Sequence, residues 1–270
     1  MRRDRLSGWR RVATAAWSAP DNPQFFGAID IEAAAVLEFI ERARAAGRQV
    51  TPTHLVGRAV ARALAAVPDV NVRIVRGRVI PNPTVDVFFV VAIDGNKSLS
   101  GVKVERADAK NVYEIATELA TRARLLKEGK DKDFSKAKLF MDGLPWPLPR
   151  FAIRFASWLA GDRGMSIRTL GITPRPFGSA MVTSVGMFGL PVGFAPLSPM
   201  YRMPILVAVA EIVEKPVAVD GRVVTRWMLP IGGTFDHRYF DGWHIAELLK
   251  PFREYLANPG NFEPAPGGGE

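Results

Sequence analysis

The stretch Gly232-Gly233-Thr234-Phe235-Asp236-His237-Arg238-Tyr239-Phe240-Asp241-Gly242 decides how this chain is interpreted. The apolar run before it predicts a strand, and the amphipathic run over 243–256 predicts a helix. His237 therefore stands at a strand-to-helix junction, where a fixed backbone can hold an imidazole. Imidazole is the side chain whose ordinary pKa suits both acid and base catalysis near neutral pH. We read His237 as a catalytic base, with Asp241 and Gly242 ordering the turn; a packed structural histidine remains the alternative.

Composition sets limits on the chemistry. The chain has 270 residues, of which 48% are hydrophobic and 23% charged, as in ordinary globular proteins. No Ser/Gly/Pro-rich linker divides it, so we predict a single domain over 1–258. Cysteine is absent, which excludes disulfides and a thiolate nucleophile of the protein's own. Any thiol in the reaction must come from a substrate, and the three histidines lack metal-ligand spacing, so we expect no metal.

The chain is basic, with a formal net charge of +9 and a pI near 10.1. Its Lys and Arg residues are spread along the sequence without a recognition-helix or aromatic-interleaved motif, so nucleic acid is not the expected partner. A basic surface suits a phosphate-bearing small molecule or an acidic partner equally well. The Arg-rich start lacks the apolar core of a secretory signal, and no apolar run reaches the length of a membrane span. We expect a cytoplasmic protein.

Periodicity and turn residues predict alternating strands and helices, which is an α/β (α+β) pattern. Thr51 and Pro52 predict a helix start, and Pro251 predicts a bend or an early break in the last helix. The tail, 259–270, is predicted to be disordered. Strands are expected at 24–31, 85–93, 99–104, 179–185, 205–213 and 228–235, hairpins about 76–77 and 219–222, and helices at 32–46, 51–67, 111–127 and 243–256.

The segment 131–177 differs in composition from the rest of the chain. It is charged, then rich in proline, and then contains the short predicted helix 151–160 with Phe151, Phe155 and Trp158 on it. This helix either packs on the body or a neighbouring subunit, or lies at a membrane surface with arginines near the lipid headgroups. Contact with a membrane through 145–160 is the less favoured of the two readings.

Several motifs together carry a resemblance to a known family. Residues 235–242 resemble the Asp-His-Arg-x-x-Asp-Gly signature of the acyltransferase (E2) catalytic domain of 2-oxoacid dehydrogenase complexes, which is related in fold to chloramphenicol acetyltransferase. Residues 178–186 are similar to a strand of that family, and 51–71 and 111–124 are similar to two of its helices. The resemblance implies a chloramphenicol acetyltransferase-like two-layer mixed-sheet sandwich with helices on one face, forming trimers, with 131–177 as an unmatched insertion.

The resemblance also implies a mechanism. His237 would deprotonate the thiol of coenzyme A or of an acceptor such as dihydrolipoamide, and the thiolate would attack a thioester. Thr183 would donate a hydrogen bond to the oxyanion, an interaction typically worth about 3 kcal/mol. Asp241 pairs with an arginine in the family, and Arg11 is the expected partner here. Ser184 stands where asparagine is common in the family, and the active site would lie between subunits of a homotrimer.

One departure from the family pattern leaves the acceptor and partners open. The usual E2 chain carries a lipoyl domain and a subunit-binding domain ahead of the catalytic one, whereas this sequence starts at the catalytic domain, so we expect a stand-alone form. A separate lipoyl protein, or another acyl acceptor, would then serve it. The alternatives to an enzyme are a non-catalytic trimeric scaffold and a membrane-surface or partner-binding protein. His54 is expected to be packed or to cap a helix, and His244 to lie at the surface.

Overall fold

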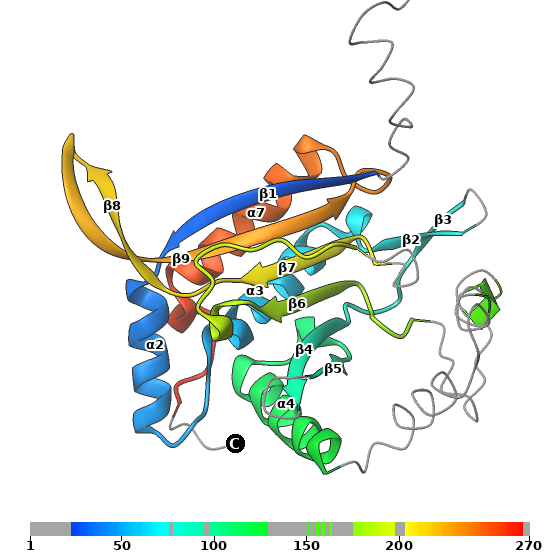
Figure 1. Ribbon diagram of the computed structural model, residues 1–270, viewed down its shortest axis with the longest axis horizontal. Coiled ribbons are helices and arrows are strands. Elements are labelled where there is room, and N and C mark those ends of the chain that lie inside the picture. The colour runs from blue at the N-terminus through cyan, green and yellow to red at the C-terminus, as the bar shows by residue number, and fades with distance from the viewer. Residues whose placement is uncertain are drawn as a thin grey trace, which may run out of the picture.

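The computed structural model describes residues 23–75, 78–93, 98–128, 175–197 and 203–266, together with residues 151, 155–156, 158–159 and 163. These residues form one mixed sheet with helices packed behind it (Figure 1). The strands are β1 (Gln24–Glu32), β2 (Val72–Val75), β3 (Arg78–Pro81), β4 (Val87–Ile93), β5 (Ser98–Val104), β6 (Ala180–Ser184), β7 (Ile205–Val209), β8 (Val213–Val219) and β9 (Arg222–Asp236). The α-helices are α2 (Ala34–Ala45), α3 (Pro52–Ala66), α4 (Val112–Lys127) and α7 (Gly242–Ala257), with 3₁₀ turns at Pro68–Val70, Ala107–Ala109, Gly186–Phe188 and Pro259–Asn261.

The large sheet has seven strands in the order β1-β9-β7-β6-β4-β5, with β8 pairing the outer part of β9. The central pairs β4–β6 and β6–β7 are parallel, and the remaining pairs are antiparallel. Strands β2 and β3 form a separate hairpin. Because β9 runs antiparallel to β6 and β7, it ends at Asp236 on the side of the sheet where the N-terminal ends of β6 and β7 lie.

The two faces of the sheet are covered differently. Alternate residues such as Val182, Val207 and Ile231 face the helices and join the main core. The opposite face carries a smaller apolar cluster of Met181, Leu197, Met203 and Leu206. The expected architecture of a mixed sheet with helices on one face is therefore confirmed. Among the described residues, no helix is long and apolar enough to cross a membrane.

Helix α3 begins as the sequence predicts. The Thr51 hydroxyl accepts a hydrogen bond from the His54 N–H, and the His54 Nδ1 accepts one from the Thr51 N–H, which makes a capping box. Pro52 occupies the first turn, where its missing N–H costs nothing. Burial lowers the pKa of His54 to about 4, because the partly buried site disfavours the charged ring.

His54 should make stability depend on pH. Its pKa is lower in the folded protein than the ordinary 6.5, so the folded state binds the proton less readily than the unfolded state. Stability is then complete above pH 6.5 and falls as pH drops from 6.5 towards 4. We expect a loss of about 1–2 kcal/mol by pH 5 in urea unfolding. Glutamine also serves at this capping-box position, so His54→Gln should keep the neutral-pH stability and lose this part of the pH dependence; an unchanged pH profile would contradict the assignment.

Three sequence-based expectations differ from the structure. The strand expected over 205–213 is two strands, β7 and β8, because the chain leaves the central sheet after Val209 and pairs again with the far end of β9. Helix α7 continues through Pro251 to Ala257, so the early break that was expected there as the alternative to a bend does not occur, since Phe252, Tyr255 and Leu256 on its last turns are buried in the core.

The C-terminal segment is the third difference. Disorder was predicted from 259 onward, but residues 259–266 are folded, with Pro259–Asn261 forming a 3₁₀ turn. The Glu263 side chain is buried and accepts hydrogen bonds from the Arg58 Nε, the Tyr255 hydroxyl and the Val112 N–H. A composition rich in Pro and Gly does not reveal this charged anchor. Residues 267–270 lie outside the described part of the chain.

Candidate active site

His237 lies directly after the last residue of β9 and is exposed in the single chain. Its N–H donates to the Pro23 carbonyl at 2.8 Å, which ties it to the start of the edge strand β1. The Phe25 ring contacts the imidazole edge-on, with ring centroids 5.2 Å apart. Within the described residues, no hydrogen bond reaches either ring nitrogen. The backbone of His237 is therefore fixed, while its ring faces outward.

The residues on both sides of His237 hold the loop in place. The buried Asp236 carboxylate accepts hydrogen bonds from the Arg238 N–H and from its guanidinium, the shortest at 2.6 Å. The Tyr239 hydroxyl accepts from the Ile74 N–H at 3.1 Å, which links the loop to the β2–β3 hairpin. Phe240 is 1% exposed and anchors the loop in the core. These contacts on either side reduce the freedom of a loop that would otherwise be mobile.

Asp241 is the N-cap of α7. Its carboxylate accepts hydrogen bonds from the N–H groups of Trp243 and His244 and lies 2.7 Å from the His244 Nδ1. The hydrogen bonds from His244 lower the pKa of Asp241 and favour its ionised form. His244 thus belongs to a capping box and is half-buried, where a surface position was expected. Arg11, the expected partner of Asp241, lies outside the described residues.

Gly242 was expected to help order the turn after His237, but its backbone conformation does not require a glycine. It is the first residue of α7, its φ is not in the left-handed region, and a Cβ placed there meets nothing within 4 Å. The turn after His237 therefore does not need a glycine within this chain.

Thr183 and Ser184 lie at the opposite end of the sheet from His237. Thr183 pairs with Ala208 of β7, which pairs with Gly232 of β9, five residues before His237. At about 3.4 Å per residue along a strand and about 4.8 Å between strands, Thr183 and His237 are roughly 20 Å apart in one chain. They cannot act on the same thioester within one chain.

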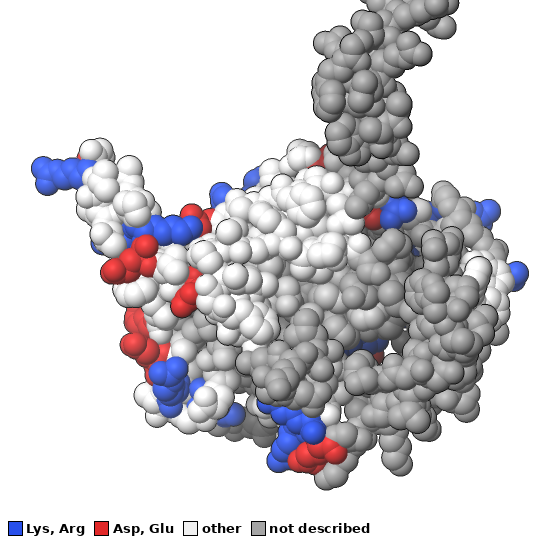
Figure 2. All heavy atoms as spheres, viewed as in Figure 1, with Lys and Arg blue, Asp and Glu red and all other residues white. Residues whose placement is uncertain are grey.

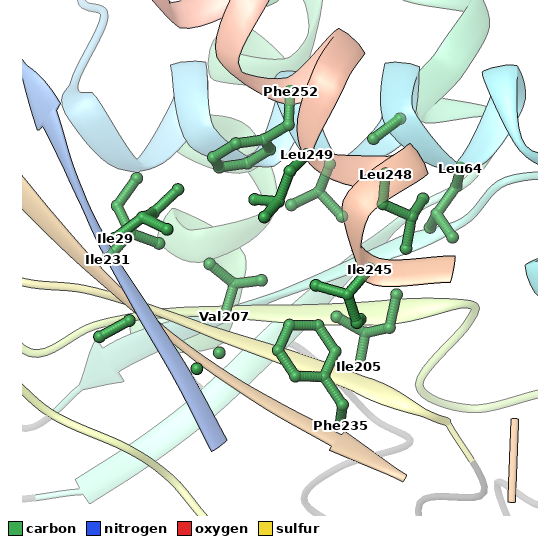
Figure 3. A pocket seen from close by; sticks show the side chains of 15 residues that line it. Ile29, Leu64, Ile205, Val207, Ile231, Phe235, Ile245, Leu248, Leu249 and Phe252 are labelled. Atoms are coloured by element: carbon green, nitrogen blue, oxygen red, sulfur yellow. The ribbon is translucent and has the colours of Figure 1, made fainter. Parts of the chain in front are cut away.

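An apolar hollow of about 170 Å³ lies between the sheet and helices α3 and α7 (Figure 3). Two paired glycines, Gly27 of β1 and Gly233 of β9, line it on the side of the sheet that faces the helices. A Cβ at 233 would come within 2.5 Å of the Phe235 ring, which lies over this glycine.

The comparisons with known proteins identify the family. A family model described as 2-oxoacid dehydrogenases acyltransferase (catalytic domain) matches residues 2–138 and 177–262. The chain belongs to this family. The match leaves out residues 139–176, which fall within the predicted insertion 131–177; most of that segment, including most of 145–160, lies outside the described residues.

The curated proteins to which this acyltransferase domain is similar agree with the family assignment. It is 25% identical over 213 residues to the dihydrolipoyllysine-residue acetyltransferase component of the acetoin cleaving system of Bacillus subtilis, covering 79% of this chain and 43% of that protein. It is 39% identical over 54 residues to the lipoamide acyltransferase component of the branched-chain alpha-keto acid dehydrogenase complex of Pseudomonas putida, covering 20% and 13%. The chain thus spans less than half the length of either relative.

Solved structures support the fold. A probable dihydrolipoamide acetyltransferase from Listeria monocytogenes superposes with a TM-score of 0.65 at 18% identity, covering 97% of each chain. The dihydrolipoamide acetyltransferase of Azotobacter vinelandii gives 0.63 at 20% identity, covering 88% of this chain and 83% of that one. The acyltransferase domain described here therefore has the fold of these catalytic cores.

Sequence reasoning proposed His237, Thr183 and Asp241 as site residues but did not point to the residues that fix the loop. Phe25, Ile74 and the Asp236–Arg238 pair are far from one another in sequence or carry no motif of their own. The alternation of apolar residues before Asp236 was the one available signal for a buried carboxylate. Among the described residues, no cluster of three or more His, Asp or Glu side chains is placed to hold a metal.

Proposed function

We propose that this domain transfers an acyl group between coenzyme A and a thiol acceptor of the dihydrolipoamide type. The observation that carries the proposal is the placement of His237: an exposed imidazole on a fixed backbone at the end of β9 in an acyltransferase family domain. Coenzyme A is a substrate here, and the thiol that the cysteine-free chain lacks comes with the substrates. A separate lipoyl protein is the proposed carrier of the acceptor, and a cytoplasmic location stays a prediction.

The proposed reaction needs one base and one oxyanion donor. His237 takes the proton of the attacking thiol, and the thiolate sulfur forms a bond to the thioester carbonyl carbon. The carbonyl oxygen becomes an oxyanion, to which the Thr183 hydroxyl donates a hydrogen bond. When the oxyanion collapses, the original carbon–sulfur bond breaks, and the departing thiolate receives the proton from the His237 imidazolium. The imidazole is neutral again, and no proton is gained or lost overall.

The separation of His237 and Thr183 supports an active site shared between copies. The two residues are at opposite ends of the same sheet, so the Thr183 that serves a given His237 must come from another chain. In a closed ring, one edge of each copy meets the other edge of the next copy. Every contact then brings a His237 together with the Thr183 of another chain. We propose the homotrimer that the sequence led us to expect.

The sheet face away from the helices offers an apolar surface for this assembly. The segment 186–197 crosses that face, and its Gly193 carbonyl lies against Gly232 of β9. In Figure 2 the described part of this face, above and to the left of the grey residues, is largely white, with charged side chains mainly at its margins. Exposed apolar groups on 186–197 and on the neighbouring β1 are Met187, Phe188, Leu190, Val192, Phe194 and Phe26. An exposed apolar area of this kind is typical of an interface between proteins.

A shared site predicts complementation between two inactive variants. Thr183→Val keeps the side-chain shape and removes the hydroxyl, so kcat should fall about 10²- to 10³-fold. His237→Gln removes the base. When both chains are co-expressed and assemble at random, about one site in four combines an intact Thr183 with an intact His237 from different chains. The hybrid should recover about a quarter of the wild-type rate of CoA release.

Two comparisons make this experiment decisive. Each variant expressed alone must stay inactive. Mixing the two separately assembled proteins, without exchange of subunits, must not restore CoA release. A hybrid no more active than the single variants would mean that the two residues act within one chain or that one of them has no role.

A further inference from the structure

The apolar hollow is separate from the site at His237. Figure 3 shows Phe235 at one end of the hollow and Ile231 at the other. The Phe235 ring stacks on Phe25 with centroids 5.3 Å apart, and Phe25 in turn contacts the His237 ring. These two packed rings stand between the hollow and the imidazole. The hollow is therefore considered as a site of its own.

The walls of the hollow are hydrocarbon. Its fifteen lining residues come from β1, β7 and β9 on one side and from α3 and α7 on the other, and none of their side chains carries a nitrogen, oxygen or sulfur atom. A water molecule inside a protein needs about two to four polar partners, which these side chains do not supply. An empty hollow leaves its lining atoms without van der Waals contacts on one side. The hollow therefore favours an occupant that is itself apolar.

The size of the hollow matches a single small ring. An engineered cavity of about 150 Å³, lined by Leu, Ile and Phe side chains, stays dry and binds benzene. The hollow here has a volume of about 170 Å³ and the same kind of lining. Its lining residues that are not buried lie on β1, on α7 and at the end of β9, and they include the exposed Gly27 and Ala28 of the edge strand. The hollow is therefore open at the edge of the sheet, beside β1.

We propose that this hollow is a binding site for a small uncharged apolar molecule, a hydrocarbon ring or alkyl group of about six or seven carbons. The site goes beyond the proposed acyl transfer and does not depend on it. An ion or a strongly polar molecule would lose its hydration there without gaining a side-chain partner, which is unfavourable. The site therefore selects its ligand by size and by the absence of polar groups.

Toluene and phenol are a matched pair of probes, because they have nearly the same size and differ by a methyl group in place of a hydroxyl. In calorimetric titration of the full chain in its assembled form, toluene should bind with a Kd on the order of 0.1–1 mM, given the burial of its carbons. Phenol should bind at least about tenfold more weakly, because its hydroxyl finds no partner. At about ten times its Kd, toluene should raise the Tm by roughly 2–4 °C, and the same concentration of phenol by about 1 °C or less.

Filling the hollow should abolish this binding. Ala63→Leu adds three carbons from α3 into the hollow, so heat of toluene binding should no longer be detected. Ala246→Leu makes the same change on the exposed face of α7 and should bind toluene as the wild type does. Gly27→Ala adds one carbon 3.7 Å from the Phe235 ring, an ordinary contact that the fold accepts. It should weaken toluene binding about threefold or more and replaces Ala63→Leu if that variant does not fold.

Methyl NMR locates the bound molecule. Toluene should shift the methyl resonances of Ile231 and Leu248, which line the hollow, and leave those of the exposed Leu190 and Val223 unchanged. Equal affinities for toluene and phenol would overturn the proposal, as would toluene binding by Ala63→Leu that equals the wild type. Absence of toluene binding to the assembled wild type would overturn it too, since the hollow would then be filled or closed. No acyl donor is present in these measurements, so their failure leaves the proposed acyl transfer untouched.

Discussion

Replacing His237 by glutamine is expected to lower kcat for CoA release by about 10²- to 10⁴-fold, the usual contribution of a general base. Glutamine has a similar polar shape but cannot take a proton from a thiol near neutral pH. The His237 side chain is exposed, and its place in the loop depends on its backbone N–H, so the fold should tolerate the change. Steady-state kinetics with saturating acyl-CoA and dihydrolipoamide measure the effect.

The same substitution elsewhere in the chain serves as the control. His54→Gln keeps the capping box of α3 and lies in a helix start remote in sequence from the β9–α7 loop, so it should retain wild-type kcat. Binding of acyl-CoA to His237→Gln should stay within a few-fold of wild type, because the base acts on the thiol and not on the donor's affinity. If a variant at 237 keeps full activity, His237 is not the catalytic base, and the motif does not have the role proposed for it.

Glu263→Gln is expected to lower the free energy of unfolding by about 3–5 kcal/mol, because it leaves the Arg58 charge buried without its partner. The pair is 3.2 Å apart, and the two side chains are 9% and 0% exposed. The Arg58 guanidinium also donates to the carbonyls of Ala107 and Asp108, so it cannot turn towards water without breaking these bonds. Burial and the Glu263 carboxylate also raise the pKa of Tyr255, which keeps its hydroxyl a donor.

Urea unfolding measures this loss as a lower midpoint at an unchanged slope. The matched control is Glu254→Gln on the exposed surface of α7, which should cost less than about 0.5 kcal/mol. The double variant Arg58→Met/Glu263→Met removes both charges and should recover much of the lost stability. Equal stability of Glu263→Gln and wild type would show that the C-terminal segment is not anchored by this pair.

Local sequence rules predicted the elements that have strong local signals. Thr51 with Pro52 starts α3, and Asn111 caps α4, because a side-chain oxygen close in sequence satisfies the first free N–H groups. The turn at Asp220 and Gly221, both with positive φ, closes the β8–β9 hairpin as predicted. The early break, one of the two outcomes expected at Pro251, does not occur, because the local cost of the proline is outweighed by the burial of Phe252, Tyr255 and Leu256 in the core.

The sequence by itself determined the family, the strand-to-helix junction at His237 and the hydroxyl at Thr183, because each depends on a short contiguous pattern. Only the tertiary structure decided that these two residues lie at opposite ends of one sheet, since strand order and direction are set by pairings between distant segments. It alone placed Glu263 against Arg58, 205 residues away in sequence, and Gly27 beside Gly233 in the lining of the apolar hollow. Such contacts depend on burial and packing of the whole chain, which no local pattern encodes.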